Sequence, residues 1–307
     1  MINKKVLIAA VLALVVSVSA GCVNVSKPTV PGGTNITNPG ENQNGSQYDE
    51  AKQEEIMKEY ENIINKEYGI SEHVSFINEN IKYLSSDNAS KLILKLEEMQ
   101  KEYRIKLEDK YYTSNIQNKL DEIVRPDYDL SKINVENIMD EKAKKLLGET
   151  INLGYKIEST EGAFFPIIDY SFYEKYSAYA TPDIKDYISI MVEESSKIPA
   201  KDAGLVISWD EILKRALNQE KFLAEHKDSV KFEDIKALYK EYVTFAVYGL
   251  DNTPLFIYGA KKMNDDAKEA YEKVIAKNGK LSQALKEYYG IIEKNGFKLN
   301  DNVENFR

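Results

Sequence analysis

ASKLILKLEEMQKEYRIKL, residues 89–107, is the stretch that decides the fold class of this chain. Its apolar side chains recur mostly at intervals of three or four, at Ala89, Leu92, Ile93, Leu96, Met99, Tyr103 and Leu107, with lysine and glutamate between them. That spacing places the apolar residues on one face of an α-helix and the charged residues on the opposite face. The stretch therefore predicts a long amphipathic helix that packs against other helices.

The flanking sequence repeats this pattern. Apolar residues share one helix face in two earlier segments, at Ile56, Tyr60, Ile63 and Ile64 and at Val74, Ile77, Ile81 and Leu84. A further helix is expected over residues 139–152. Residues 48–153 are therefore interpreted as an N-terminal helical region, either a solvated bundle or an antiparallel hairpin that resembles a coiled coil.

Helix boundaries are marked more clearly in the second half. Pro182 follows Thr181 and suits a first helical position, because the N–H that proline lacks would have no partner there. Ser208 and Glu211 have the spacing of a capping box, in which each side chain bonds the other residue's backbone N–H. Gly249 follows the next periodic stretch and predicts the end of a helix.

Two helix pairs are expected in this half, at about 208–248 and 264–295, each with a short polar turn. In this respect the region resembles the helical hairpins of tetratricopeptide-type repeats, although the two pairs differ in length. The resemblance implies stacked helical hairpins. No alternation of strands and helices indicates a doubly wound sheet. Residues 154–307 are therefore assigned to a C-terminal helical region.

An irregular, aromatic-rich connector interrupts the helical pattern between residues 154 and 180. It holds Tyr155, Phe164, Phe165, Tyr170, Phe172, Tyr173, Tyr176 and Tyr179, and it is punctuated by Gly162 and Pro166. We expect a loop or a short pair of strands here, and we place the boundary between the two helical regions at its start. The predicted fold class is thus mostly α, with amphipathic helices, stacked helical hairpins and this connector.

The first residues have the order of an export signal. Lys4 and Lys5 precede an apolar run and then small residues, as in signal peptides. The run is shorter than the ~20 residues that a membrane-spanning helix needs. Residues 18–22, VSAGC, resemble the lipobox of bacterial lipoprotein precursors, which implies cleavage before Cys22 and a diacylglyceryl group on its sulfur. Ordinary secretory cleavage after Ala20 is the alternative.

Residues 1–21 are therefore the expected signal peptide, and residues 22–47 the expected disordered tether. The tether is rich in glycine, proline, asparagine, serine and threonine, so it cannot bury enough surface to fold. The whole arrangement resembles helical surface lipoproteins of low-GC Gram-positive bacteria, which implies a lipid-anchored location on the extracytoplasmic face of the cell membrane. Cys22 is the only cysteine, so the fold must form without an internal disulfide.

The charge balance argues against one class of partner. The chain has 50 acidic and 41 basic side chains and a formal net charge of −9. Phosphate binding needs clustered lysine and arginine, so we expect no nucleic acid partner. Adsorption to an anionic membrane through charge is also disfavoured. Membrane attachment is therefore expected through the lipid on Cys22.

No catalytic or metal-binding set stands out. His73 and His226 lie far apart in charged, helix-terminal contexts, so each is interpreted as structural or solvated rather than as a triad member or metal ligand. Residues 127–131 briefly resemble a calcium loop, but Lys132 stands where that loop needs glycine and Ile138 where it needs glutamate. The chain has no glycine-rich phosphate loop either. We therefore expect no metal and no cofactor, and an enzyme is the less favoured class.

The aromatic-rich connector is the one candidate region for binding. Glu161 and Asp169 flank its apolar centre, and two acids beside aromatic rings can serve as acid and base on a glycan. Tyrosine also offers a stacking face and a hydroxyl to a sugar or a peptide. The candidate residues are Glu161, Asp169, Tyr170, Tyr173 and Trp209, the only tryptophan. The alternative is that the rings fill the core and the acids are solvated.

These observations favour a non-catalytic surface lipoprotein that binds or scaffolds a peptide, a protein or a cell-wall component. The first alternative is a carboxylate-based hydrolase that acts on cell-wall glycan through Glu161 and Asp169. The second alternative is a solute-binding lipoprotein of an uptake system. That class usually needs two α/β lobes, and the strand patterns for such lobes are missing here.

Overall fold

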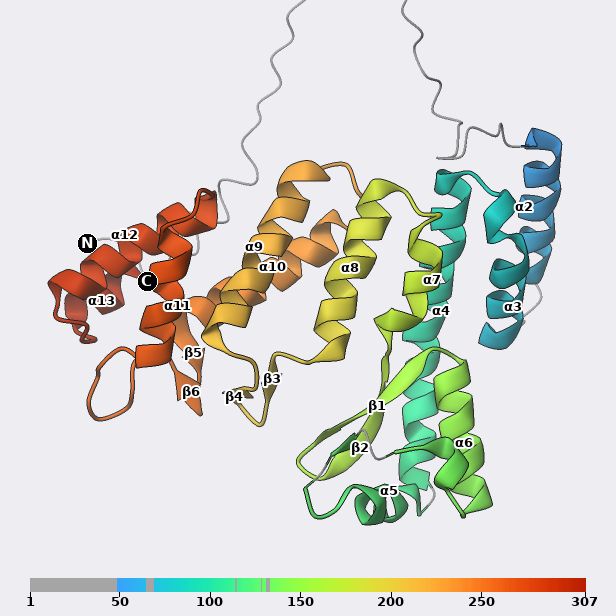
Figure 1. The fold of residues 1–307 in the computed structure, drawn as a ribbon, viewed down its shortest axis with the longest axis horizontal. Coiled ribbons are helices and arrows are strands. Elements are labelled where there is room, and N and C mark those ends of the chain that lie inside the picture. Colours follow the sequence, from blue (N-terminus) through green and yellow to red (C-terminus); the bar gives the residue numbers. More distant parts are fainter. Residues whose placement is uncertain (1–48, 65–68, 114, 128, 131–132) are drawn as a thin grey trace, which may run out of the picture. The chain divides into compact units, whose positions relative to one another are not determined.

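The computed structural model describes residues 49–64, 69–113, 115–127, 129–130 and 133–307, so the expected signal peptide, the tether and Cys22 lie outside the described residues. The described chain forms two compact units. The N-terminal unit runs to Asp202, and the C-terminal unit comprises Ala203–Arg307. Both units are mostly helical, as the apolar periodicity predicts (Figure 1).

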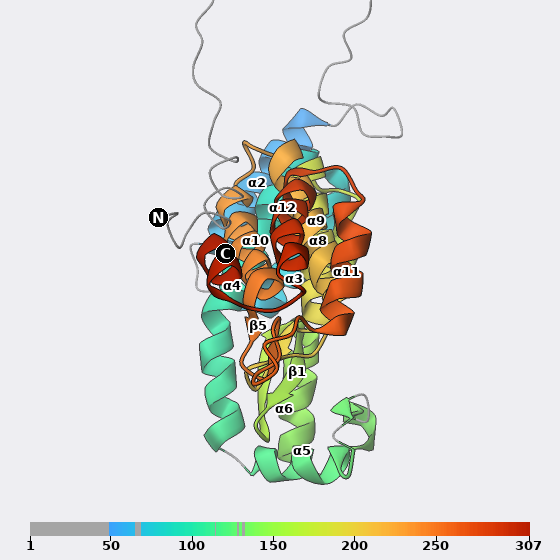
Figure 2. The same cartoon turned by 90° about the vertical axis from the view of Figure 1, so that its left-hand side faces the viewer.

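The N-terminal unit surrounds one long helix. Its elements are α2 (Glu50–Ile64), α3 (Ile70–Asn80), η1 (Ile81–Tyr83), α4 (Ser86–Thr113), α5 (Ile116–Val124), η3 (Val135–Asn137), α6 (Glu141–Asn152), β1 (Tyr155–Thr160), β2 (Ala163–Ile168), η4 (Tyr170–Tyr173), α7 (Glu174–Ser177), α8 (Pro182–Ser196) and β3 (Ala200–Lys201). Figure 2 shows α5 lying across the end of α4.

The predicted amphipathic helix is α4. Its face at Leu92, Ile93 and Leu96 is at most 1% exposed, and Leu107 and Tyr111 extend this buried face towards the C-terminal end. Full burial of each such side chain contributes about 1.5–3 kcal/mol. The helix α3, the hairpin strand β2 and the helix α5 all pack on α4. The apolar face of α4 is therefore the centre of the core of the N-terminal unit.

The aromatic-rich connector begins as a β-hairpin. β1 pairs antiparallel with β2, from Tyr155 opposite Ile168 to Thr160 opposite Ala163. The two-residue turn consists of Glu161 and Gly162, whose φ angles are 49° and 77°. Positive φ at both central residues is the mark of a type I′ turn, whose twist matches that of the two strands. The sequence predicts either a loop or a short pair of strands for the connector. The structure has the pair of strands, and helical turns follow it.

The boundary between the units differs from the one that the sequence predicts. The predicted boundary precedes the connector, at residue 154, whereas the compact units divide after Asp202. The cause is the burial of the connector: β1 packs on α6, β2 on α4, and η4 on α8. Most of its aromatic residues therefore belong to the core of the N-terminal unit, whereas Tyr179 is exposed.

The C-terminal unit contains the predicted stacked helical hairpins. Its elements are β4 (Gly204–Leu205), α9 (Trp209–Glu225), α10 (Phe232–Tyr248), β5 (Gly249–Leu250), β6 (Thr253–Pro254), α11 (Asp265–Ile275), α12 (Lys280–Lys294) and α13 (Asp301–Phe306). α9 pairs with α10, α11 packs on α9 and pairs with α12, and α13 packs on α12 (Figure 1).

The predicted helix boundaries of this unit are largely confirmed. The Ser208 hydroxyl oxygen accepts a hydrogen bond from the Glu211 backbone N–H at 3.2 Å, which is one half of the expected capping box. The Glu211 carboxylate instead accepts from the Arg215 Nε–H at 2.9 Å. Gly249 ends α10 with a φ of 71°, and the Asn264 side chain caps α11.

Candidate functional site

The structure does not bring the two predicted acids together. Glu161 is exposed in the β1–β2 turn, and Asp169 follows the far end of β2. The strand between them spans about 20 Å at the usual rise per residue. The Asp169 carboxylate accepts hydrogen bonds from the Ser171 backbone N–H at 3.1 Å and the Ser171 hydroxyl at 2.7 Å, and so caps η4.

Tyr170 is buried against a carboxylate in the core of the N-terminal unit. It is 5% exposed, and Glu97 of α4 is 2% exposed. The hydroxyls of Tyr170 and Tyr187 both donate to Glu97 Oε1, each at 2.5 Å. The Lys101 ammonium also contacts this oxygen, at 2.9 Å. We call Glu97, Lys101, Tyr170 and Tyr187 the Glu97 network. Burial raises the pKa of Tyr187 far above its ordinary value, so this hydroxyl stays protonated.

Tyr173 and its neighbours bond to Gln100, one helical turn further along α4. Tyr173 is 1% exposed, and its hydroxyl donates to the Gln100 side-chain oxygen. The Gln100 amide donates to the Leu153 carbonyl oxygen at 2.6 Å, and the Tyr155 hydroxyl donates to the Gln100 carbonyl oxygen at 2.7 Å. These tyrosines are thus satisfied within the core, where a solvent-borne ligand does not reach their ring faces.

Trp209 lies in the other unit. It is the first residue of α9, directly after the Ser208 cap, and it is 7% exposed. The five predicted binding residues are therefore an exposed turn residue, a helical cap, two core tyrosines and a core tryptophan of a different unit.

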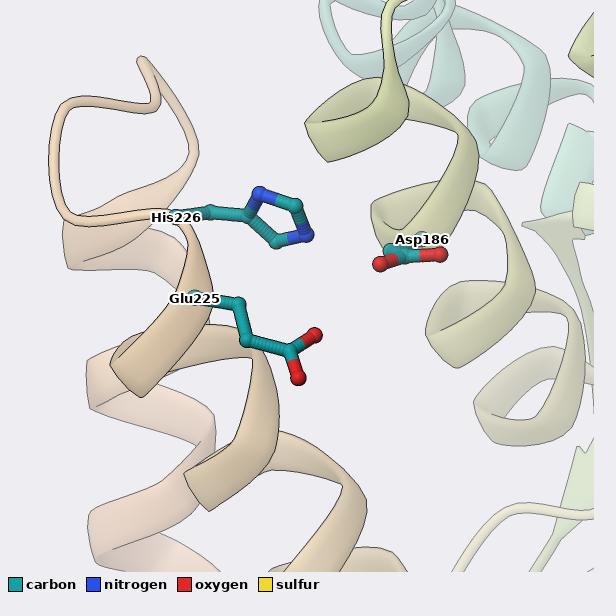
Figure 3. A group of neighbouring side chains, drawn as sticks. All are labelled: Asp186, Glu225 and His226. Atoms are coloured by element: carbon teal, nitrogen blue, oxygen red, sulfur yellow. The ribbon is translucent and has the colours of Figure 1, made fainter.

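The two histidines occupy structural positions. His73 is 1% exposed, its Nδ1 lies 3.4 Å from the Tyr60 hydroxyl oxygen, and burial lowers its pKa. His226 packs on Phe222 at the C-terminal end of α9, with a ring separation of 4.9 Å. Figure 3 shows His226 together with Glu225 of α9 and Asp186 of α8. Since Asp186 belongs to the N-terminal unit and the other two to the C-terminal unit, we assign no metal centre to them.

A groove of about 670 Å³ lies in the N-terminal unit beside Tyr103 and Glu149. Glu149 accepts from the Tyr103 hydroxyl at 2.7 Å and from the Lys110 ammonium at 2.5 Å. Burial raises the pKa of Glu149, but these two hydrogen bonds outweigh it, so the pKa lies below its ordinary value. The carboxylate is thus occupied by an internal ion pair, which does not suit a general acid.

A more apolar opening lies in the C-terminal unit. We call it the hairpin cleft, because residues of the β5–β6 hairpin line one part of it. Its volume is about 450 Å³, within the range of small-molecule sites. Phe256, which is buried, and the half-buried Tyr248 and Arg307 line its interior. Ile257 and Tyr258 line its surface edge and are 43% and 70% exposed.

Backbone hydrogen bonds hold this exposed edge in place. The Ile257 N–H donates to the Lys262 carbonyl oxygen at 2.8 Å, and the Lys261 N–H donates back to the Ile257 carbonyl oxygen at 2.8 Å. The Leu299 N–H donates to the Lys261 carbonyl oxygen at 2.7 Å. Ile257 and Tyr258 therefore stay at the surface on a fixed loop, although burial of these side chains is normally favourable.

Glycine is required on the other side of the hairpin cleft. Gly249 joins α10 to β5 with a φ of 71°, and a Cβ atom at this position would lie 2.3 Å from the Thr253 carbonyl oxygen. Asp251 and Asn252 form the turn between β5 and β6. The hairpin cleft itself was not predicted. The signal available for it was the apolar pair Ile257–Tyr258 next to Gly259, between two predicted helices.

No family model, curated protein or solved structure matches this chain. None of the described helices is long and apolar enough to cross a membrane. The functional argument therefore depends on the residues and contacts given above.

Proposed function

We propose that the chain is an extracytoplasmic lipoprotein, anchored through a lipid on Cys22, whose helical body binds a peptide, a protein or a cell-wall component. The observation that carries the binding role is the hairpin cleft with its exposed and rigidly held apolar edge. Exposed apolar residues that gather beside an opening are a feature of surfaces that contact another molecule. The anchor rests on the lipobox at residues 18–22 and on the polar tether that follows it.

The hydrolase alternative receives no support from the carboxylates that suggested it. Acid and base pairs of glycosidases are about 5–9.5 Å apart, whereas Glu161 and Asp169 lie at opposite ends of β2. The uptake alternative requires two α/β lobes. The sheets of the described residues have two strands each, and β1–β2 and β5–β6 are antiparallel hairpins, so we do not favour that alternative.

The anchor is tested by labelling cells with a fatty acid precursor. We expect the wild-type protein to take up label and to sediment with membranes. Cys22→Ala should lose the label and leave the membrane fraction, since no other lipid acceptor is proposed. The anchor proposal is wrong if the wild-type protein takes up no label, or if Cys22→Ala remains in the membrane fraction to the same extent.

The binding role is tested with purified protein and isolated cell walls. We expect co-sedimentation with the walls without release of soluble glycan. Release of reducing sugar that Glu161→Gln or Asp169→Asn abolishes would replace the binding role by the hydrolase. Failure to bind cell walls, their peptide fraction or isolated surface proteins would overturn the binding role.

A further inference from the structure

The hairpin cleft has the lining of a site for apolar side chains. Tyr248, Leu250, Pro254, Phe256, Ile257 and Tyr258 all contribute to it. The charged residues that line it are Asp251, Lys261 and Arg307. A saccharide presents a hydroxyl on most of its carbons and needs many polar partners. An aliphatic or aromatic side chain needs mainly apolar contact, which this lining supplies.

Of the three charged residues at the hairpin cleft, Arg307 is already paired, whereas Asp251 and Lys261 can contact a ligand. The Arg307 guanidinium is paired with Glu304, and its carbon Cζ lies 4.9 Å from the centroid of the Tyr248 ring. Arg307 is therefore engaged within the unit. Asp251 and Lys261 are exposed, and within the described part of the chain neither has an ion-pair partner. The surface edge of the cleft thus offers one carboxylate and one ammonium group to a ligand.

These two charges come from different backbone segments, each fixed in position. Asp251 lies in the turn between β5 and β6. Lys261 lies in the loop after Tyr258, with a φ of 52° and with its N–H and carbonyl groups both hydrogen-bonded. A ligand that satisfies both must carry a cation and an anion, and it must also present an apolar group to the apolar lining of the same cleft.

We infer that the hairpin cleft binds a short zwitterionic peptide. Its apolar side chain packs against Phe256 and Tyr258, its ammonium group contacts Asp251, and its carboxylate contacts Lys261. This inference rests on the proposed binding function and names the ligand class for it. A free peptide terminus and an acidic or basic side chain supply the same charges, so the inference concerns the charge pattern and the apolar group.

The test is isothermal titration of the full chain in detergent with the dipeptide Leu-Phe. Its termini are free in one sample and blocked by acetyl and amide groups in the other. We expect Tyr258→Ala to weaken binding of the free dipeptide about tenfold, as for an aromatic anchor. Asp251→Asn and Lys261→Gln should each weaken it about two- to fivefold, the range of exposed ion pairs. The blocked dipeptide should bind more weakly and should be insensitive to these two charge changes.

Tyr112→Ala is the matched control, because Tyr112 is 55% exposed on α4 of the N-terminal unit. We expect it to bind the free dipeptide as the wild-type protein does. The inference is overturned if the free dipeptide does not bind, or if the three cleft variants bind it unchanged. Binding of N-acetylglucosamine oligomers in place of the dipeptide also overturns it. If Tyr258→Ala binds neither dipeptide nor oligomer but still sediments with cell walls, the cleft inference keeps its support and the wall is bound elsewhere. If the wild-type protein binds the dipeptide but no wall component, the cleft inference stands and only the proposed binding of the cell wall fails.

Discussion

Removal of one hydroxyl group from the Glu97 network should destabilise the N-terminal unit measurably. Tyr187→Phe keeps the ring but removes a donor that lies 2.5 Å from Glu97 Oε1. The carboxylate is 2% exposed, so water does not replace the lost donor. A hydrogen bond to a charged group contributes about 1.5–3 kcal/mol to stability. In a unit of this size such a loss lowers Tm by about 3–12 °C.

The assay is denaturant unfolding of the full chain, with hydrogen exchange of the α4 amides to separate the N-terminal unit from the C-terminal unit. Tyr179→Phe is the control, since Tyr179 belongs to the same connector and is 38% exposed. It should change the unfolding free energy by less than about 0.5 kcal/mol. Tyr170→Phe should resemble Tyr187→Phe, and the double variant should deviate from additivity because both hydroxyls share one acceptor.

The reasoning would be refuted by equal effects of Tyr187→Phe and Tyr179→Phe on α4 exchange. In that case the carboxylate of Glu97 would have enough other partners, or enough water, to do without Tyr187. Additive effects of Tyr170→Phe and Tyr187→Phe would refute the shared acceptor alone.

Three further predictions concern the buried His73, the hairpin cleft and the turn of the connector. Burial lowers the pKa of His73 in the folded state below its ordinary value of 6.5. Below about pH 6.5 the histidine of the unfolded chain binds a proton more readily than the buried histidine does. The stabilising contribution of neutral His73 is therefore complete above this pH and is lost as the pH falls. His73→Gln should therefore reduce the loss of Tm between neutral and mildly acidic pH, and an unchanged pH profile would contradict this. Gly249→Ala should cost at least about 2 kcal/mol through its clash and positive φ, measured by urea unfolding. The control Gly290→Ala, in open space on α12, should gain about 0.5–1 kcal/mol. Glu161→Asn should raise stability by about 0.5 kcal/mol, because asparagine suits a type I′ turn better; a marked loss would show that the Glu161 carboxylate has a structural role.

The helices and their ends follow from the sequence because they depend on local features. The apolar face of α4 is visible as a period of three to four residues, and Ser208 and Gly249 are each identified by the backbone groups that a helix terminus leaves unpaired. The buried polar residues were not predictable in the same way. Glu97 and Gln100 lie on the buried face of α4, but an argument from apolar periodicity counts such residues as exposed.

The position of the connector could not be derived from its composition. An aromatic-rich run with glycine and proline is compatible with a linker, a binding surface or a core, because local sequence does not say which elements cover it. Here the covering elements are α4 and α8, which lie before and after it in the chain. The hairpin cleft was missed for a similar reason, since its lining comes from separate loops and the end of α10.

The Glu97 network also constrains when the N-terminal unit can fold. The hydroxyls that satisfy Glu97 come from residues 73 and 90 positions later in the chain. Until that part of the polypeptide is present, packing of α4 would bury this carboxylate without the two tyrosine hydroxyls and with Lys101 as its remaining partner in the network, which is unfavourable. We therefore expect α4 to pack stably only after most of the N-terminal unit has been made. If the chain is exported as proposed, such a delay would favour an unfolded chain during its passage through the translocation channel.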